Sequence, residues 1–202
     1  YGRGGGPYQD ASGHAWTDNA LRFGLLSKVA ATHAADSSPL PWRPDVLHCN
    51  DWQTGLAPAY LHFGSGRRAR TVMAIHNLMF QGVFAPSAVA QAGLPAKSFS
   101  INGVEYYGNM SFLKAGIYYA DRIVTVSPTY AKEIMNPSVA GGLADVLQSR
   151  QARVYGILNG IDQDFYDPRY DGLIFQNYGP ANSTGGKAAN KKHLQERLGL
   201  EV

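Results

Sequence analysis

The fold is decided by residues 44–82, which read PDVLHCNDWQTGLAPAYLHFGSGRRARTVMAIHNLMFQG. Two apolar runs within them, Val46–Cys49 and Thr71–Ile75, have the length and composition of buried strands. Residues 54–63 predict a helix with Pro58 near its start, because a proline further inside would cost about 3 kcal/mol or more. Strand, helix and strand over about thirty residues form one βαβ unit, and such units build parallel sheets.

Polar side chains follow both strands at the point where each ends. Asp51 follows the first strand, and His76 and Asn77 follow the second. Ligands of open parallel sheets bind outside the carboxyl ends of the strands, so these residues predict a binding site. Taken alone, Asp51 could equally cap the next helix, and a lone histidine is more often structural. Together, the carboxylate, imidazole and amide groups suit the hydroxyl groups of a sugar.

The rest of the chain alternates helices and strands in the same way. Further helices are predicted over residues 19–35, 111–120, 128–135, 143–149 and 187–198, and further strands over 122–126 and 154–158. The last of these strands also ends in polar residues, Asn159-Gly160, although this pair could simply form a turn. This alternation predicts an α/β fold with a mostly parallel sheet.

Two of the predicted helices carry a recognisable apolar pattern. Leu21, Leu25 and Val29 recur every four residues and predict the buried stripe of the helix over 19–35. In the helix over 111–120, the inward residues are expected to be Phe112, Leu113 and Ile117. Residues 77–109 have little regular pattern, apart from a short helix near 87–91, and a loop of that length is often functional.

Composition excludes several functional classes. The 202 residues are 45% hydrophobic and carry a net charge of only +3, with no basic stripe that would indicate nucleic-acid binding. No apolar run approaches the roughly 18 residues of a membrane span. The single cysteine, Cys49, excludes an internal disulfide and suits a reducing compartment.

The sequence contains no convincing metal or cofactor motif. Gly185-Gly186-Lys187 resembles the end of a phosphate-binding loop, but Ala181 and Ala188 replace the required glycine and the residue that holds magnesium. Asp162-Gln163-Asp164 follows an Asn-Gly turn and is expected to belong to that turn. The histidines are not spaced like metal ligands, so neither a metal nor a cofactor is expected.

Five motifs resemble those of the glycogen/starch synthase family, and they occur in the order found in that family. They are Arg43–Leu61, Ala74–Gly82, Ser111–Asp121, Val126–Ala131 and Ile157–Asp162. The resemblance covers nearly the whole chain. It implies a Rossmann-like parallel sheet with helices on both faces, as an incomplete N-terminal domain of a two-domain GT-B glycosyltransferase.

The resemblance also implies an activity and the residues that serve it. The family transfers glucose from ADP-glucose to the non-reducing end of an α-1,4-glucan, with retention and without a metal. By position in the family motifs, His76 and Asp51 would be catalytic. The residues expected to bind substrate are Tyr8, Asn77, Gln81 and Asn159.

The chain departs from the family pattern in ways that bear on its activity. The family's Lys-Thr-Gly-Gly-Leu motif and its second domain, which supplies Arg, Lys and Glu residues for the donor, are absent from these residues. We expect residues 1–186 to be the latter part of the N-terminal domain and residues 187–202 to be a helix leading toward the second domain. The chain alone should therefore be inactive, and it should self-associate through the uncovered edge of the strand over 46–49. Asn50 and Gln53 also stand where bacterial relatives commonly have histidine.

Two other functions remain open from the sequence. A sucrose or trehalose-phosphate synthase relative would share the two-domain architecture, and a non-catalytic glucan-binding module would share the ligand. The expected location is the cytoplasm of a bacterium, or the plastid stroma if the chain comes from a plant.

Overall fold

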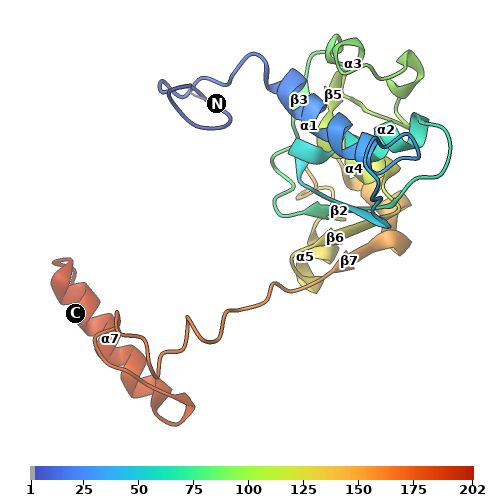
Figure 1. The fold of residues 1–202 in the computed structure, drawn as a ribbon. Coiled ribbons are helices and arrows are strands. Elements are labelled where there is room, and N and C mark those ends of the chain that lie inside the picture. The colour runs from blue at the N-terminus through green and yellow to red at the C-terminus, as the bar shows by residue number, and fades with distance from the viewer. Residues whose placement is uncertain (1–2) are drawn as a thin grey trace. The chain divides into compact units, whose positions relative to one another are not determined.

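The computed structural model describes residues 3–202, so the first two residues of the domain predicted over 1–186 lie outside it. The chain forms two compact units (Figure 1). The first unit ends at Leu158, and the second runs from Asn159 to Val202.

The first unit is built on a four-stranded parallel sheet with strand order β1-β2-β6-β7. The strands are β1 (Val46–Asn50), β2 (Arg70–Ile75), β6 (Arg122–Thr125) and β7 (Val154–Gly156). The register aligns Cys49 with Met73 and Met73 with Ile123. All four predicted strands are present, and the α/β class with a parallel sheet is confirmed.

Helices connect and cover these strands. In the first unit they are α1 (Asn19–His33), α2 (Ala57–Phe63), α3 (Ala88–Gln91), α4 (Phe112–Tyr119), α5 (Pro128–Glu133) and α6 (Ala144–Ser149), with short 3₁₀ turns η1 (Trp52–Thr54), η2 (Ala96–Ser98) and η3 (Gln151–Arg153). Pro58 lies in the first turn of α2, as predicted. The Oγ atom of Ser127 accepts a hydrogen bond of 2.9 Å from the backbone N–H of Tyr130 and so caps α5.

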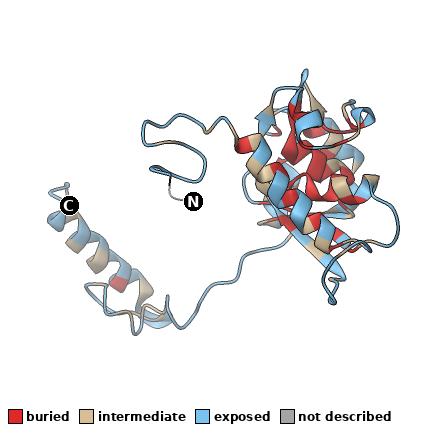
Figure 2. Cartoon of the chain, turned by 45° about the horizontal axis from the view of Figure 1, so that its top comes forward, coloured by how far each residue is buried: buried red, intermediate tan, exposed pale blue. Residues whose placement is uncertain are grey.

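Seven of the eight residues of helix α4 are buried, so this helix forms the centre of the core, and Figure 2 shows the buried residues of the chain concentrated in the first unit. Phe112, Leu113 and Ile117 are all fully buried, which confirms the inward face predicted for this helix. The sheet approaches α4 closely at Gly116, where a Cβ atom would lie 2.6 Å from the sulfur of Met73. This close contact fixes the ends of the neighbouring strands relative to α4.

The buried stripe predicted for α1 is wrong. Leu21, Leu25 and Val29 are all exposed, and the buried face carries Asn19, Gly24, Ser27 and Ala31. These smaller residues lie on the opposite side of the helix and let it pack closely against α2 and η1. The four-residue spacing correctly indicated a helix and three residues on one face of it. The buried face is the other one, where small residues allow close packing against the neighbouring elements.

Residues 77–109 are more ordered than their sequence predicts. The expected short helix is α3, but a three-stranded antiparallel sheet, in the order β3-β5-β4, is also present. Its strands are β3 (Val83–Phe84), β4 (Glu105–Tyr106) and β5 (Asn109–Ser111), and these are too short to show a period of two in the sequence. The buried ammonium group of Lys114 donates to the carbonyl oxygens of Ile101 and Glu105 and holds this segment against α4.

The second unit contains η4 (Pro180–Asn182) and α7 (Ser183–Arg197). Helix α7 begins at Ser183, and not at Lys187 as predicted. Gly186, near its start, packs against Tyr178 with no room for a side chain. Gly199, with a φ of +67°, follows the end of this helix, as expected. Within residues 3–202, no helix combines the length and the apolar character needed to cross a membrane.

Strand β1 lies at the edge of the main sheet. It pairs with β2 on one side, and no other strand of the described residues pairs with it. Val46 is 52% exposed at the start of β1, and Tyr155 is 47% exposed on β7. The sheet therefore presents an open edge and a partly uncovered face.

Candidate active site

The carboxylate of Asp51 joins the ends of two neighbouring strands. Its Oδ1 atom accepts hydrogen bonds from the backbone N–H groups of His76, at 2.8 Å, and Asn77, at 3.4 Å. It makes no side-chain cap to η1, so the alternative that Asp51 simply caps the next helix is wrong. The structure thus brings Asp51, His76 and Asn77 together at the carboxyl end of the sheet, where ligands of such folds bind.

The backbone of Asp51 is strained. Its φ of 51° and ψ of −169° lie close to a region that is essentially restricted to glycine. A residue held there costs about 1–3 kcal/mol, and such conformations cluster at active sites and ligand clamps. The two hydrogen bonds from the residues that follow β2 hold Asp51 in this conformation.

The imidazole of His76 has a side-chain partner that the sequence did not reveal. Its Nε2 atom lies 3.1 Å from Oδ1 of Asn50, the last residue of β1. An amide oxygen can only accept, so Nε2 is the nitrogen that donates in this contact, and in a neutral ring Nδ1 is then an acceptor. Asn50 is held in turn by Thr54, whose hydroxyl donates to its backbone carbonyl oxygen at 2.8 Å.

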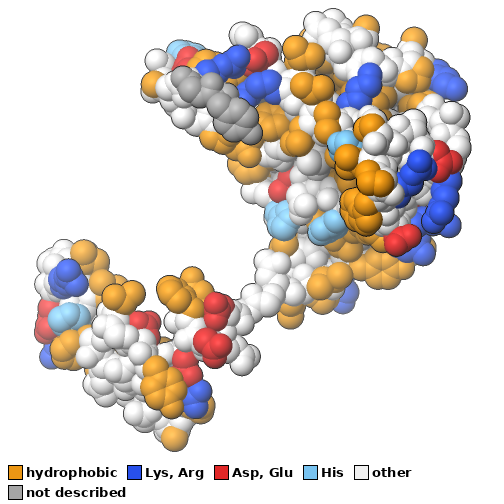
Figure 3. All heavy atoms as spheres, viewed as in Figure 1, with side chains coloured by type: hydrophobic (Ala, Val, Ile, Leu, Met, Phe, Trp, Pro, Cys, Tyr) orange, Lys and Arg blue, Asp and Glu red, His pale blue; other side chains and the backbone are white. Residues whose placement is uncertain are grey.

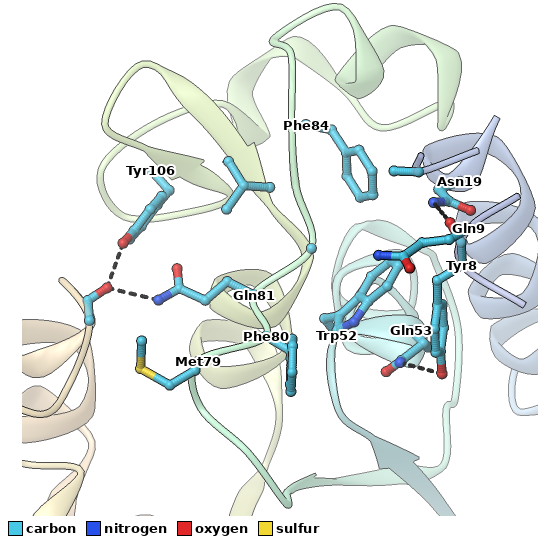
Figure 4. Close-up of a pocket in the computed structure, with 14 residues that line it drawn as sticks. Tyr8, Gln9, Asn19, Trp52, Gln53, Met79, Phe80, Gln81, Phe84 and Tyr106 are labelled. Carbon is cyan, nitrogen blue, oxygen red and sulfur yellow. Dashed lines mark hydrogen bonds between the residues drawn. The ribbon is translucent and has the colours of Figure 1, made fainter. Parts of the chain in front are cut away.

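A cavity of about 890 Å³ is lined by residues that follow Asp51 and Asn77 in the chain, although neither of these two nor His76 lines it (Figure 4). Its walls come from the N-terminal segment, η1, the loop after β2, and β3. The lining residues are Tyr8, Gln9, Ala15, Asn19, Trp52, Gln53, Met79, Phe80, Gln81, Gly82, Val83, Phe84, Tyr106 and Gly141. Two predicted substrate-binding residues, Tyr8 and Gln81, are among them.

Tyr8 is fixed at the rim of the cavity by an aromatic cluster and one hydrogen bond. Its ring centroid lies 5.7 Å from that of Phe23 and 6.0 Å from that of Trp52. The amide nitrogen of Gln53 donates to its hydroxyl at 2.9 Å. Gln53 belongs to the site for this reason, but only its place in the Asn-Asp-Trp-Gln stretch could have indicated it.

Gln81 and Gly82 shape the opposite wall. The amide nitrogen of Gln81 donates to the carbonyl oxygen of Gly141 at 2.8 Å, while its Oε1 atom is buried with no partner among the described residues. Gly82 has a φ of +59°, and a Cβ atom there would lie 2.4 Å from Cε3 of Trp52. Glycine is therefore required for the chain to turn past the indole ring.

Every residue that lines this cavity is uncharged, and aromatic rings and amide groups predominate. Such a lining suits a neutral, polyhydroxylated ligand, which presents apolar ring faces together with hydroxyl groups. Residues 3–202 contain no group of three His, Cys, Asp or Glu side chains that could hold a metal ion.

The predicted site residues fall into three groups. Asp51, His76 and Asn77 form the strand-end cluster, and Tyr8 and Gln81 line the adjoining cavity. Asn159 is the first residue of the second unit and is described only within that unit, where it is exposed.

Comparison with known proteins identifies the family. Residues 1–149 match the family model described as the starch synthase catalytic domain. The chain belongs to the starch synthase catalytic domain family. It is 57% identical over 202 residues to a glycogen synthase from Nitrosospira multiformis, and 55% identical over 201 residues to one from Nitrosomonas europaea. Both matches include the whole of this chain but only 40% of the relative, so the chain spans about two fifths of these proteins.

A solved structure agrees with this family. The catalytic domain of starch synthase IV from Arabidopsis thaliana, bound to ADP and acarbose, matches this starch synthase domain with a TM-score of 0.72 and 28% identity. The match covers 94% of the chain and 39% of that structure. The sequence resemblance and the α/β fold class are both confirmed.

Proposed function

We propose that this chain is part of a glycogen synthase that transfers glucose from ADP-glucose to the non-reducing end of an α-1,4-glucan, with retention of configuration. The observation that carries the proposal is the Asp51–His76 cluster at the carboxyl end of the sheet, because the residues that follow it in the chain, Trp52 and Met79 among them, line a large uncharged cavity. The family relationship supports it, because the relatives that include the whole chain are named glycogen synthases.

In this proposal the strand ends bind the donor glucose. The Nδ1 atom of His76 accepts a hydrogen bond from a sugar hydroxyl, and Asn159 is assigned to donor binding by its position in the family motif. As the anomeric carbon becomes positive in the transition state, the nearby carboxylate of Asp51 stabilises that charge without acting as a strong base. Fixed backbone hydrogen bonds hold this carboxylate in place before the substrate arrives.

The uncharged cavity binds the acceptor glucan. Phe80, which is 64% exposed, offers a ring face to the apolar side of a glucose unit, while Tyr8 and Gln53 offer hydroxyl and amide groups. The lining contains no cation for the departing diphosphate. We therefore assign that role to a part of the enzyme beyond these 202 residues, consistent with a chain that spans 40% of its relatives.

The same reasoning extends the proposal to domains and location. We assign residues 1–186 to the N-terminal domain and residues 187–202 to the connection toward a second domain. The enzyme acts in the bacterial cytoplasm, or in the plastid stroma if the source is a plant.

Alanine variants of the whole enzyme carrying this chain test the proposal. His76→Ala and Asn159→Ala should each lower kcat/KM for ADP-glucose by about a hundredfold or more, since each removes a contact made to the reacting sugar. Asn109→Ala is the matched control, because Asn109 is also an exposed polar residue but does not line the cavity. Normal transfer by both site variants would remove these residues from the active site.

A glucan-binding module is the second candidate, because the same cavity would serve it. Glycogen pull-down with and without ADP-glucose separates the two functions. Binding that is independent of the nucleotide sugar, in a whole protein without transferase activity, would favour the module.

A further inference from the structure

A second cavity, of about 480 Å³, opens at the opposite end of the main sheet from Asp51 and His76. It lies where β2, β6 and β7 begin and where α2 and α6 end. We call it the basic cavity; its lining residues are His62, Arg68, Tyr118, Tyr119, Asp121, Ser149, Arg150, Ala152 and Arg153. Lys and Arg side chains also gather along the right-hand side of the first unit in Figure 3.

The single carboxylate of the basic cavity is already fully engaged. Both oxygens of Asp121 accept from the guanidinium of Arg68, at 2.8 and 3.2 Å. Its Oδ2 atom also accepts from the backbone N–H and the hydroxyl of Thr71, at 2.8 and 3.1 Å. Asp121 therefore neutralises Arg68, and its Oδ1 atom also lies 3.8 Å from the guanidinium of Arg70, so its charge is already shared between two cations.

Arg150 and Arg153 are left without a carboxylate. Within residues 3–202, neither forms an ion pair. The guanidinium of Arg150 donates to the carbonyl oxygens of Tyr118 and Ala120, which fix its orientation but do not neutralise it. Burial lowers the pKa of Arg150 most and the charge of Arg153 lowers it further, while the charge of Asp121 acts in the opposite direction, so Arg150 and Arg153 repel each other.

We propose that the basic cavity binds the phosphate group of a small phosphorylated molecule. A phosphate between Arg150 and Arg153 would relieve their mutual repulsion, and guanidinium groups bind phosphate oxygens through paired, charge-assisted hydrogen bonds. Ser149 and Tyr118 add hydroxyl groups at the same rim. The volume is in the range of small-molecule pockets and exceeds the need of a bare phosphate, so an organic phosphate fits better.

Titration of the 202-residue chain at constant ionic strength tests this proposal. The probes are inorganic phosphate, a hexose phosphate and the same hexose without phosphate, each followed by backbone amide NMR shifts. We expect saturable shifts around residues 118–121 and 149–153 with both phosphates and none with the free hexose. If the hexose phosphate binds more tightly than inorganic phosphate, the cavity also contacts the sugar. If the two bind equally, the cavity contacts only the phosphate group.

Two variants make the result decisive. Arg153→Gln removes an exposed cation without touching the core and should weaken phosphate binding about tenfold. Arg197→Gln, at the exposed end of α7, should leave it unchanged. Undiminished binding by Arg153→Gln, shifts centred on Asp51 and His76, or the absence of saturable binding would each overturn the proposal. The outcome does not depend on transferase activity.

Discussion

Asn50, the last residue of β1, and His76, the residue that follows β2, meet through a single contact of 3.1 Å between Oδ1 of the amide and Nε2 of the imidazole. Strands β1 and β2 are parallel, and their register pairs Asn50 with Ala74. His76, two residues after Ala74, therefore leaves β2 close to the end of β1. A neutral amide fixes the imidazole tautomer without adding charge to the donor site. A histidine at position 50 would bring a second titratable group to the same place.

Asn50 variants should therefore change the tautomer of His76. In Asn50→Leu the imidazole loses its acceptor, and ¹⁵N spectra of the chain should change from one dominant Nε2–H tautomer to a mixture. In the whole enzyme we expect kcat/KM to fall about tenfold, a typical loss for an outer partner of a functional histidine. Asn50→Asp keeps an acceptor oxygen at this position and should retain the Nε2–H tautomer of His76. An unchanged spectrum in Asn50→Leu would mean that the contact does not orient the ring.

Phe80 should contribute to binding of the acceptor glucan and not to binding of the donor ADP-glucose. Its side chain is 64% exposed and lines the uncharged cavity, so its removal should not disturb the core. In the whole enzyme, Phe80→Ala should raise KM for glycogen about three- to tenfold, the value of one lost aromatic contact, and leave KM for ADP-glucose unchanged. Ile101→Ala, at an exposed apolar residue outside this cavity, is the control. An equal rise in both KM values would contradict the assignment.

Asp121 should make the stability of the chain depend on acid pH. Burial alone would raise the pKa of Asp121, but hydrogen bonds from Arg68 and Thr71 outweigh it and lower the pKa from 3.8 to about 2. Because the folded pKa is the lower one, the stabilisation is complete above about pH 4 and is lost as the pH falls toward 2. It amounts to about 1–2 kcal/mol after allowance for solvent screening.

The measurement is urea unfolding of the chain and of Asp121→Asn from pH 7 to pH 2. Asp121→Asn should unfold more easily at pH 7, and its free energy of unfolding should approach that of the unmodified chain below pH 4. Asp45→Asn is the control, since Asp45 is 94% exposed and its contact with Arg67 spans 3.9 Å. A constant difference between Asp121→Asn and the unmodified chain at every pH would show that geometry, and not charge, is responsible.

The sequence predicted the features that depend on local residue patterns, and it did not predict those that depend on how distant segments pair and pack. The strand ends were identifiable because buried apolar runs stop abruptly at Asp51 and His76. The contact between Asn50 and His76 could not be predicted, because it depends on the register of β1 and β2, and the sequence of either strand alone does not give that register. The exposed leucines of α1 have the same cause, because a neighbour that fits small residues more closely decided which face is buried.

The isolated chain should lack transferase activity. The lining of the proposed acceptor cavity is uncharged, and the strand-end cluster includes no cation for the diphosphate. We expect no detectable incorporation of radiolabelled glucose from ADP-glucose into glycogen by the 202-residue chain, even at high protein concentration. Clear synthase activity by the chain alone would refute this and would require a group that binds the diphosphate at the strand-end cluster or in the uncharged cavity.

The open edge of β1 should make the isolated chain self-associate. Its backbone groups on the side away from β2 have no strand partner among the described residues, and open edges recruit further strands. We expect the sedimentation coefficient to rise with protein concentration. Val46→Lys, which places a charge at the exposed start of this edge, should favour the monomer. Thr32→Lys, at an exposed position of α1, is the control for added charge. A monodisperse monomer with a well-protected β1 in hydrogen exchange would mean that the edge is covered within one chain, and charge at Val46 would then change nothing.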